Sequence, residues 1–212
     1  MLAAFTPGLF IVPVIVVVVF VLVIWAARVQ ARKTRDRLQA FAQRAGLRST
    51  ERSTLGFASV ESLDGEQSGR AIRYWTYATG SGQSRTTWVA VSVRPRAETG
   101  LKFNLTRQNF GSKLLELFGA KEIQVGDPAF DQAWFVRTNQ PEFFAAALVP
   151  QIRARLMAEP AGRWSAGYKL EQNGVEYIEQ GSFSDSEVLE RLERQLPLLH
   201  ELADVAEVAA GN

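Results

Sequence analysis

The chain has 212 residues, of which 47% are hydrophobic, and a formal net charge of +2. It has no cysteine, which excludes disulfide bridges, thiolate metal sites and cysteine nucleophiles. Its length suits one folded domain.

The first 27 residues carry no charged side chain, and residues 8–27 form an apolar run rich in valine. About 20 helical residues cross the roughly 30 Å hydrocarbon core of a bilayer. In lipid, an unpaired backbone amide costs several kcal/mol, so a helix is favoured despite the β propensity of valine. The run therefore predicts a transmembrane helix with Trp25 near one interface. The alternatives are a buried core helix, which rarely lacks a polar face, and a signal peptide, which needs basic residues before the run.

Basic residues follow the apolar run and none precedes it. By the positive-inside rule, we expect the N-terminus to face outward and the rest of the chain to be cytoplasmic. Residues 28–48 carry a net charge of +6, whereas residues 49–212 carry −4. The basic segment is a candidate for contact with anionic lipid, although setting the topology alone explains it equally well. The candidate lipid contacts are Arg28, Arg32, Lys33, Arg35 and Arg37.

The chain after the anchor predicts an α+β fold. Apolar residues between Leu38 and Ala45 recur at helical spacing, and Gly46 is placed to end this stalk helix. We therefore divide the chain into an anchor at 1–27, a basic stalk helix at 28–48 and a cytoplasmic domain at 49–212.

Short segments rich in β-branched and aromatic residues predict an antiparallel meander, with turns at 64–65 and 80–82. The expected strands are 56–62, 70–78, 87–94 and 101–107.

The second half of the domain mixes helices and strands without regular alternation, which also favours α+β, a mainly antiparallel sheet with packed helices. Pro141 is placed to open a helix that Pro150 bends or restarts. Asn173-Gly174 predicts a hairpin, and Ser184 to Glu187 form a capping box before the last helix. The other expected elements are a helix at 112–118, strands at 122–125 and 132–137, hairpin strands at 168–172 and 175–179, and a last helix that bends near Pro197.

Several short motifs resemble a family of uncharacterised bacterial single-pass membrane-anchored proteins, classed as a domain of unknown function. They are Ala-Gly-Leu at 45–47, Leu-Lys-Phe-Asn-Leu at 101–105, Gly-Asp-Pro-Ala-Phe-Asp at 126–131, which leads to Phe-Val at 135–136, and Val-Glu-Tyr-Ile at 175–178. The resemblance covers nearly the whole chain and implies a shared fold and an inner-membrane setting. It brings no catalytic residue and no cofactor.

The candidate polar site is the pair Asp127 and Asp131, four residues apart around a Pro-Ala-Phe turn. Two such carboxylates can hold a divalent cation or act as an acid and a base. Bonding to local backbone amides explains them better. His200, the single histidine, lies in the last helix without a nucleophile motif. Aromatic and basic residues alternate near Trp75 and Trp88, but the acidic domain argues against nucleic acid.

These observations predict a membrane-tethered, non-enzymatic binding or scaffolding protein. The expected partners are the bilayer and a protein, engaged by an exposed sheet face or by the hairpin at Gly80. We expect no catalytic residue, no metal and no cofactor. Two alternatives stay open, namely a membrane-bound metal-dependent hydrolase that uses Asp127 and Asp131, and an anionic-lipid-sensing module.

Overall fold

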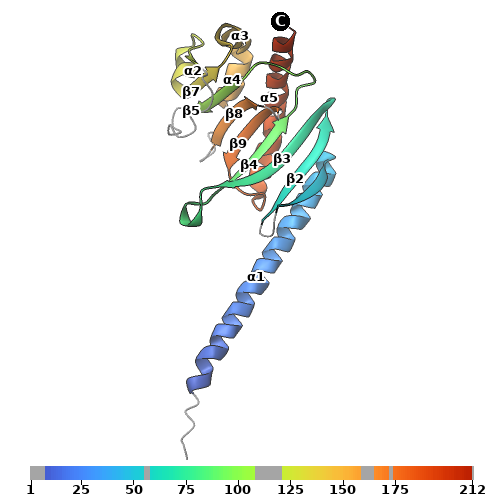
Figure 1. The fold of residues 1–212 in the computed structure, drawn as a ribbon, viewed down its shortest axis with the longest axis vertical. Helices are drawn as coiled ribbons and strands as arrows, with labels where there is room; N and C mark the ends of the chain where they lie inside the picture. The colour runs from blue at the N-terminus through green and yellow to red at the C-terminus, as the bar shows by residue number, and fades with distance from the viewer. Residues whose placement is uncertain (1–7, 55–57, 108–120, 159–164, 172–173, 212) are drawn as a thin grey trace, which may run out of the picture. The chain divides into compact units, whose positions relative to one another are not determined.

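A computed structural model describes residues 8–54, 58–107, 121–158, 165–171 and 174–211 (Figure 1). Over these residues the fold is α+β, as expected, with helices and a nine-stranded sheet in which neighbouring strands run antiparallel. Contacts divide the chain into two compact units, Met1–Phe41 and Ala42–Asn212. We describe each unit by itself.

Helix α1 (Gly8–Ala45) begins in the first unit and ends in the second. Gly46 ends it in a left-handed conformation, with φ of 68°, and the Leu47 N–H donates to the Ala42 carbonyl at 2.7 Å. Over the residues that the structure describes, no helix combines the length and the apolar character needed to cross a membrane. The side chains before Val18 lie outside the described part. The transmembrane helix expected over residues 8–27 stays a prediction.

The sheet has the spatial order β1-β2-β3-β4-β9-β8-β5-β7-β6. Strands β2, β3 and β4 form the first three strands of the expected meander, and β1, which was not predicted, pairs with β2 at the edge. The fourth expected strand, 101–107, corresponds to β5 and does not follow β4 in the sheet, because the β8–β9 hairpin inserts between them. A short 3-10 turn, Gly82–Ser84, lies in the β3–β4 connection. The strands are β1 (Arg48–Thr54), β2 (Ala58–Gln67), β3 (Arg70–Thr79), β4 (Thr86–Val93), β5 (Phe103–Arg107), β6 (Lys121–Ile123), β7 (Trp134–Thr138), β8 (Ser165–Glu171) and β9 (Gly174–Gln180).

The turn predicted at Asp64-Gly65 is wrong. Strand β2 continues through both residues, and the chain reverses at Ser68 and Gly69, which have φ of 52° and 70°. Gly65 has a packing role instead, because a Cβ at this position would lie 2.5 Å from Cδ2 of Leu47. A glycine in a strand marks either a bend or a close approach, and here it marks a close approach.

The helices of the second unit agree with the sequence in part. Helices α3 (Pro141–Ala147) and α4 (Pro150–Ala158) confirm that Pro150 restarts the helix. Helix α2 (Pro128–Ala133) was not predicted, and its last two residues fall in the strand expected over 132–137. Helix α5 (Ser186–Ala210) is capped by Asp185, not by Ser184, and contains Pro197. The helix expected over 112–118 lies outside the described residues.

The main core lies between the sheet and helices α2 to α5. Figure 1 shows α5 running along β4 and β9, and the alternating side chains Val89, Val91 and Val93 of β4 are 0% exposed on this side. On α5 the buried residues include Leu192, Leu199 and Leu202, which recur at helical spacing.

A buried arginine fixes the C-terminal half of α5 to β3. Arg70 is 4% exposed, and its Nε donates to Oε1 of Glu207 at 2.9 Å. It also bonds to the carboxylate of Asp204 and donates to the His200 carbonyl at 3.3 Å. Glu207 in turn accepts from the Arg96 backbone N–H at 2.7 Å. Strand β3, helix α5 and the β4–β5 connection therefore meet at one guanidinium and one carboxylate.

Because of this cluster, we expect the folded protein to lose stability in acid. The hydrogen bond from Arg70 lowers the pKa of Glu207 from 4.5 to about 2. Because the folded state favours the carboxylate, its stabilisation is complete above pH 4.5 and is lost as the pH falls toward 2. We expect Glu207→Gln to cost about 1 kcal/mol at neutral pH, allowing for solvent screening, and to flatten the stability profile over this window. Urea unfolding at a series of pH values measures both effects. An unchanged acid slope in Glu207→Gln would contradict the assignment.

Candidate functional site

The two faces of the sheet have different neighbours. Contacts from strands to helices come from one set of alternating side chains. Tyr168 of β8 donates its hydroxyl to Oε1 of Gln195 on α5 at 2.5 Å. Phe103 of β5 stacks on Phe144 of α3, and Arg107 of β5 donates to the Leu156 carbonyl of α4. The opposite side chains of these strands point away from helices α2 to α5. We call that side the helix-free face.

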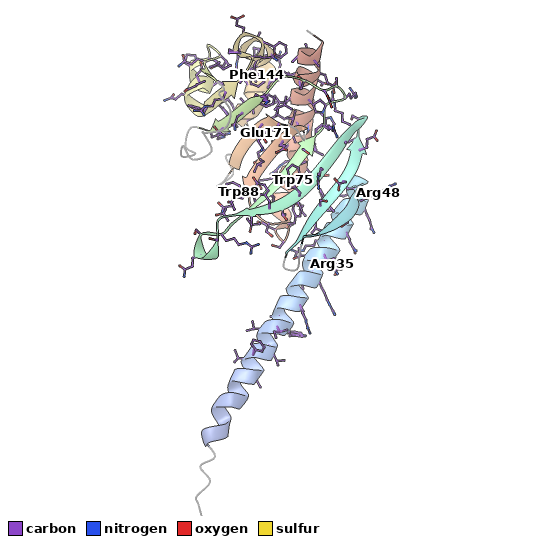
Figure 2. The ribbon with its side chains drawn as sticks, in the orientation of Figure 1. Arg35, Arg48, Trp75, Trp88, Phe144 and Glu171 are labelled. Atoms are coloured by element: carbon purple, nitrogen blue, oxygen red, sulfur yellow. The ribbon has the colours of Figure 1, made fainter. Side chains whose placement is uncertain are left out.

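The helix-free face carries an aromatic cluster on three adjacent strands, with Trp75 and Trp88 labelled in Figure 2. Trp75, Tyr77 and Trp88 are partly exposed and pack on Ala90 and Ile178, which are 0% and 7% exposed. Tyr77 and Trp88 are opposite each other in the sheet and stack with centroids 6.5 Å apart. The Trp88 indole N–H donates to Oγ1 of Thr79 at 2.8 Å, which fixes the ring. The cluster presents aromatic surface in fixed orientations.

A row of polar side chains runs beside the aromatic cluster. The strand registers place its members directly opposite one another, from β2 to β6, on the helix-free face. Residues opposite each other on one face interact, and opposite charges alternate along part of this row. In spatial order the row is Asp64, Arg73, Ser92, Glu176, Lys169, Asn104, Arg137 and Glu122.

The centre of the polar row is an ion-paired group with low exposure. Lys169 Nζ lies 3.3 Å from Oε2 of Glu176 and 2.8 Å from Oε2 of Glu171. Burial raises the pKa of Glu176, which is 3% exposed, although Lys169 opposes this shift. Burial tends to lower the pKa of Lys169, but the two carboxylates outweigh it and raise that pKa. Burial also raises the pKa of Tyr77. The group is therefore an ordered, ion-paired part of this face.

The candidate pair Asp127 and Asp131 makes the local backbone bonds that turn chemistry predicts. Asp127 caps α2 by accepting from the Phe130 N–H at 3.2 Å, and its other oxygen lies 3.3 Å from Arg153 Nε. The two oxygens of Asp131 accept from the N–H groups of Val125 and Gly126, at 2.9 and 3.1 Å. Among the described residues, no group of three or more His, Cys, Asp or Glu is placed to hold a metal ion.

These bonds give Asp131 a measurable structural role. We expect Asp131→Ala to lower the free energy of unfolding by about 2 kcal/mol, because two backbone amides lose a charged acceptor. We also expect no change in divalent-cation affinity. Urea unfolding and calorimetric titration with Mg²⁺ or Mn²⁺ test the two statements, with Glu98→Ala as the control for loss of an exposed carboxylate. Loss of a tight cation site in Asp131→Ala would favour the hydrolase instead.

The other candidate residues belong to helices α1 and α5. Arg28, Arg32, Lys33, Arg35 and Arg37 are exposed on α1. His200 is half-buried rather than fully exposed, with Nδ1 3.4 Å from Arg70 Nη1. Burial, and secondly the charge of Arg70, lower its pKa. His200 therefore belongs to the cluster that holds α5.

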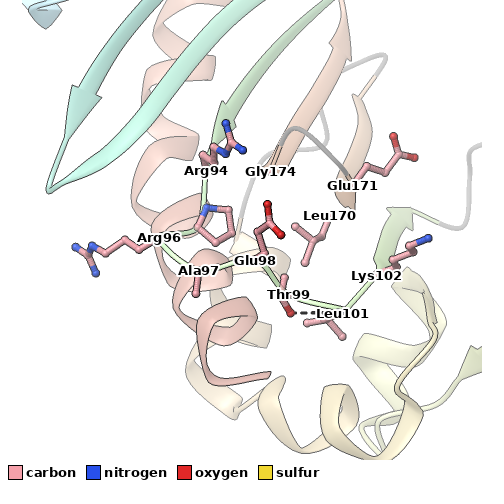
Figure 3. A pocket seen from close by; sticks show the side chains of 11 residues that line it. Arg94, Arg96, Ala97, Glu98, Thr99, Leu101, Lys102, Leu170, Glu171 and Gly174 are labelled. Atoms are coloured by element: carbon pink, nitrogen blue, oxygen red, sulfur yellow. Dashed lines mark hydrogen bonds between the residues drawn. The ribbon is translucent and has the colours of Figure 1, made fainter. Parts of the chain in front are cut away.

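A pocket of about 550 Å³ lies where the β4–β5 connection passes the β8–β9 hairpin (Figure 3). Leu101 and Leu170 lie beside charged residues of both signs in its lining. Figure 3 shows the Arg96 side chain directed away from the centre, and Arg96 is bonded to the Ser68 carbonyl and to Glu207. The hydroxyl of Thr99 accepts from the Leu101 N–H at 3.1 Å. The Arg96 and Thr99 side chains of the pocket lining therefore hold the β4–β5 connection in place.

The sequence suggested an exposed sheet face as a binding surface but did not identify its residues. The signal was present in the alternation of Arg73, Trp75 and Tyr77, which places all three on one side of a strand. Comparison of the chain with models of protein families, with curated proteins and with solved structures gives no match. The resemblance to a membrane-anchored family stays a prediction.

Proposed function

We propose that this protein is a membrane-tethered binding or scaffolding protein. In this proposal the N-terminal part of α1 lies in the bacterial inner membrane with the N-terminus outside. The domain lies in the cytoplasm and binds a protein partner on its helix-free face. The bilayer supplies localisation, which raises the concentration of the domain near membrane-bound partners without a catalytic residue.

The observation that supports the proposed membrane tether is the exposed apolar surface of α1. All eight side chains of residues 18–25 are large and apolar, with exposed fractions from 37% for Ile24 to 64% for Phe20 and Trp25. Eight residues cover more than two helical turns, so the apolar surface surrounds the helix. A helix that is apolar on every side requires burial in protein or in lipid. Exposed bases follow on the same helix from Arg28 onward, which supports the cytoplasmic orientation.

The surface proposed for the partner is the aromatic cluster with the polar row beside it. Partly exposed Trp and Tyr side chains provide large rigid contact area at low entropic cost, and they are enriched at protein interfaces. The ring orientations are fixed by the stacking of Tyr77 on Trp88 and by the bond from Trp88 to Thr79. The polar row offers hydrogen-bonding groups in a set geometry. Such a surface suits recognition of a protein better than chemistry.

Site-specific photo-crosslinking in native membranes tests the proposed surface. A photoreactive phenylalanine at Tyr77 retains an aromatic ring on the helix-free face. The matched control carries the same group at Arg194, which is exposed on α5. We expect the Tyr77 probe to give discrete crosslinked species that the Arg194 probe does not give. Equal crosslinking from both positions, or none from Tyr77, would reject the helix-free face as the binding surface.

A further inference from the structure

The bases that follow the apolar part of α1 fall on two faces of the helix. At about 100° per residue, Arg28, Arg32 and Arg35 lie within about 60° of one another, and Trp25 adjoins them at i−3 from Arg28. Lys33 and Arg37 form a second pair, about 100° or more away from this stripe. All of these side chains are exposed, and Trp25 is 64% exposed. One face of the helix therefore combines an indole with three guanidinium groups.

This stripe begins in the headgroup layer of a bilayer that covers the apolar part of α1. Arg28, Arg32 and Arg35 lie about 4.5, 10.5 and 15 Å along the axis from Trp25, at 1.5 Å per residue, so Arg28 lies within the layer and the other two follow on its aqueous side. The headgroup layer is about 5 to 7 Å thick on each side of the hydrocarbon core, and Trp favours its inner border. The Cα–Cβ bonds of a helix tilt toward its N-terminus, so these arginine side chains lean back toward the bilayer.

We propose that Arg28, Arg32 and Arg35 form a binding site for the headgroup of an anionic phospholipid, with Trp25 at its apolar border. Guanidinium groups bind phosphate oxygens through paired hydrogen bonds, and each well-placed base strengthens binding to an anionic membrane about fivefold. The acidic balance of residues 49–212 leaves the attraction concentrated at residues 28–48. This inference rests on the membrane tether of the proposed function.

Spin-labelled lipids measure directly whether the protein prefers an anionic phospholipid to a zwitterionic one. The full-length protein is placed in phosphatidylcholine vesicles, and the association of spin-labelled phosphatidylglycerol is compared with that of spin-labelled phosphatidylcholine. The test variant is Arg28→Gln with Arg32→Gln. The matched control is Lys33→Gln with Arg37→Gln, which removes two charges at the same i, i+4 spacing from the other face.

We expect the wild type to prefer phosphatidylglycerol, the test variant to lose at least fivefold of that preference, and the control to change by less than twofold. Equal losses of the phosphatidylglycerol preference in both variants would show that the preference depends only on the number of positive charges, and would overturn the proposed binding site. A wild-type protein without a preference for phosphatidylglycerol would also overturn it. Flotation and alkaline extraction of the same vesicles separate the two proposals. A protein that floats and resists extraction but shows no preference retains the tether and loses the lipid site. A protein that does not float loses both.

Discussion

Replacing Val21 and Leu22 of α1 by Asp is expected to remove the protein from the membrane fraction. Both side chains are 56% exposed in the apolar part of the helix. An Asp near the centre of a transmembrane helix costs about 2.5 to 3.5 kcal/mol, so two together outweigh much of the gain from the apolar residues. The measurement is the fraction of the full-length protein that stays in the membrane pellet after alkaline carbonate extraction.

The control for this prediction is Gln39→Asp, which adds an acidic residue at an exposed position of the same helix beyond the apolar part. We expect it to behave as the wild type. Equal retention of the double Asp variant and the wild type would mean that residues 18–25 are covered by protein and not by lipid.

The second large effect is expected at Arg70. Arg70→Leu removes the hydrogen bonds and ion pairs that Arg70 makes with Glu207, Asp204 and the His200 carbonyl. Breaking a buried ion pair from one side typically costs 3 to 5 kcal/mol, because the remaining charges lose their partner. Since Asp204 is 64% exposed and can be solvated, we expect a loss of about 3 kcal/mol. Urea unfolding of the full-length protein in detergent, followed by tryptophan fluorescence, measures it.

Arg85→Leu provides the comparison, because it makes the same change at an exposed position of the β3–β4 connection. It should alter stability by less than about 0.5 kcal/mol. If Arg70→Leu were as mild as Arg85→Leu, the cluster would not be what holds the C-terminal half of α5 to the sheet.

Elements with a strong local signal were predicted well. The alternation of Val89, Val91 and Val93 gave β4, and proline at the first helical turn gave α3 and α4. Strand β1 was missed because its sequence, Arg-Ser-Thr-Glu-Arg-Ser-Thr, has no apolar alternation. Its position depends on pairing with β2, which is a tertiary effect. The turn was misplaced because Asp64-Gly65 is a good turn signal locally, whereas contact with Leu47 gives Gly65 its role.

The residues of the helix-free face were harder to predict from the sequence. Tyr74 is buried and its neighbour Trp75 is partly exposed, because successive side chains of β3 lie on opposite faces of the sheet. The cluster also requires β9 to lie beside β4, which brings Ile178 to Ala90 across a long stretch of sequence. No local pattern predicts that pairing. Asp127 and Asp131 illustrate the opposite case, because their bonds are local and the turn interpretation follows from the sequence alone.

Cysteine accessibility gives the most direct test of the membrane tether. The chain has no cysteine, so Gly211→Cys places a single thiol at the exposed C-terminal end of α5. Spheroplasts are treated with a membrane-impermeant maleimide before and after lysis, and the membranes are then extracted with alkaline carbonate. We predict that the protein stays in the extracted membranes and is labelled only after lysis. Labelling in intact spheroplasts, or release of the protein as a soluble species, would contradict the account.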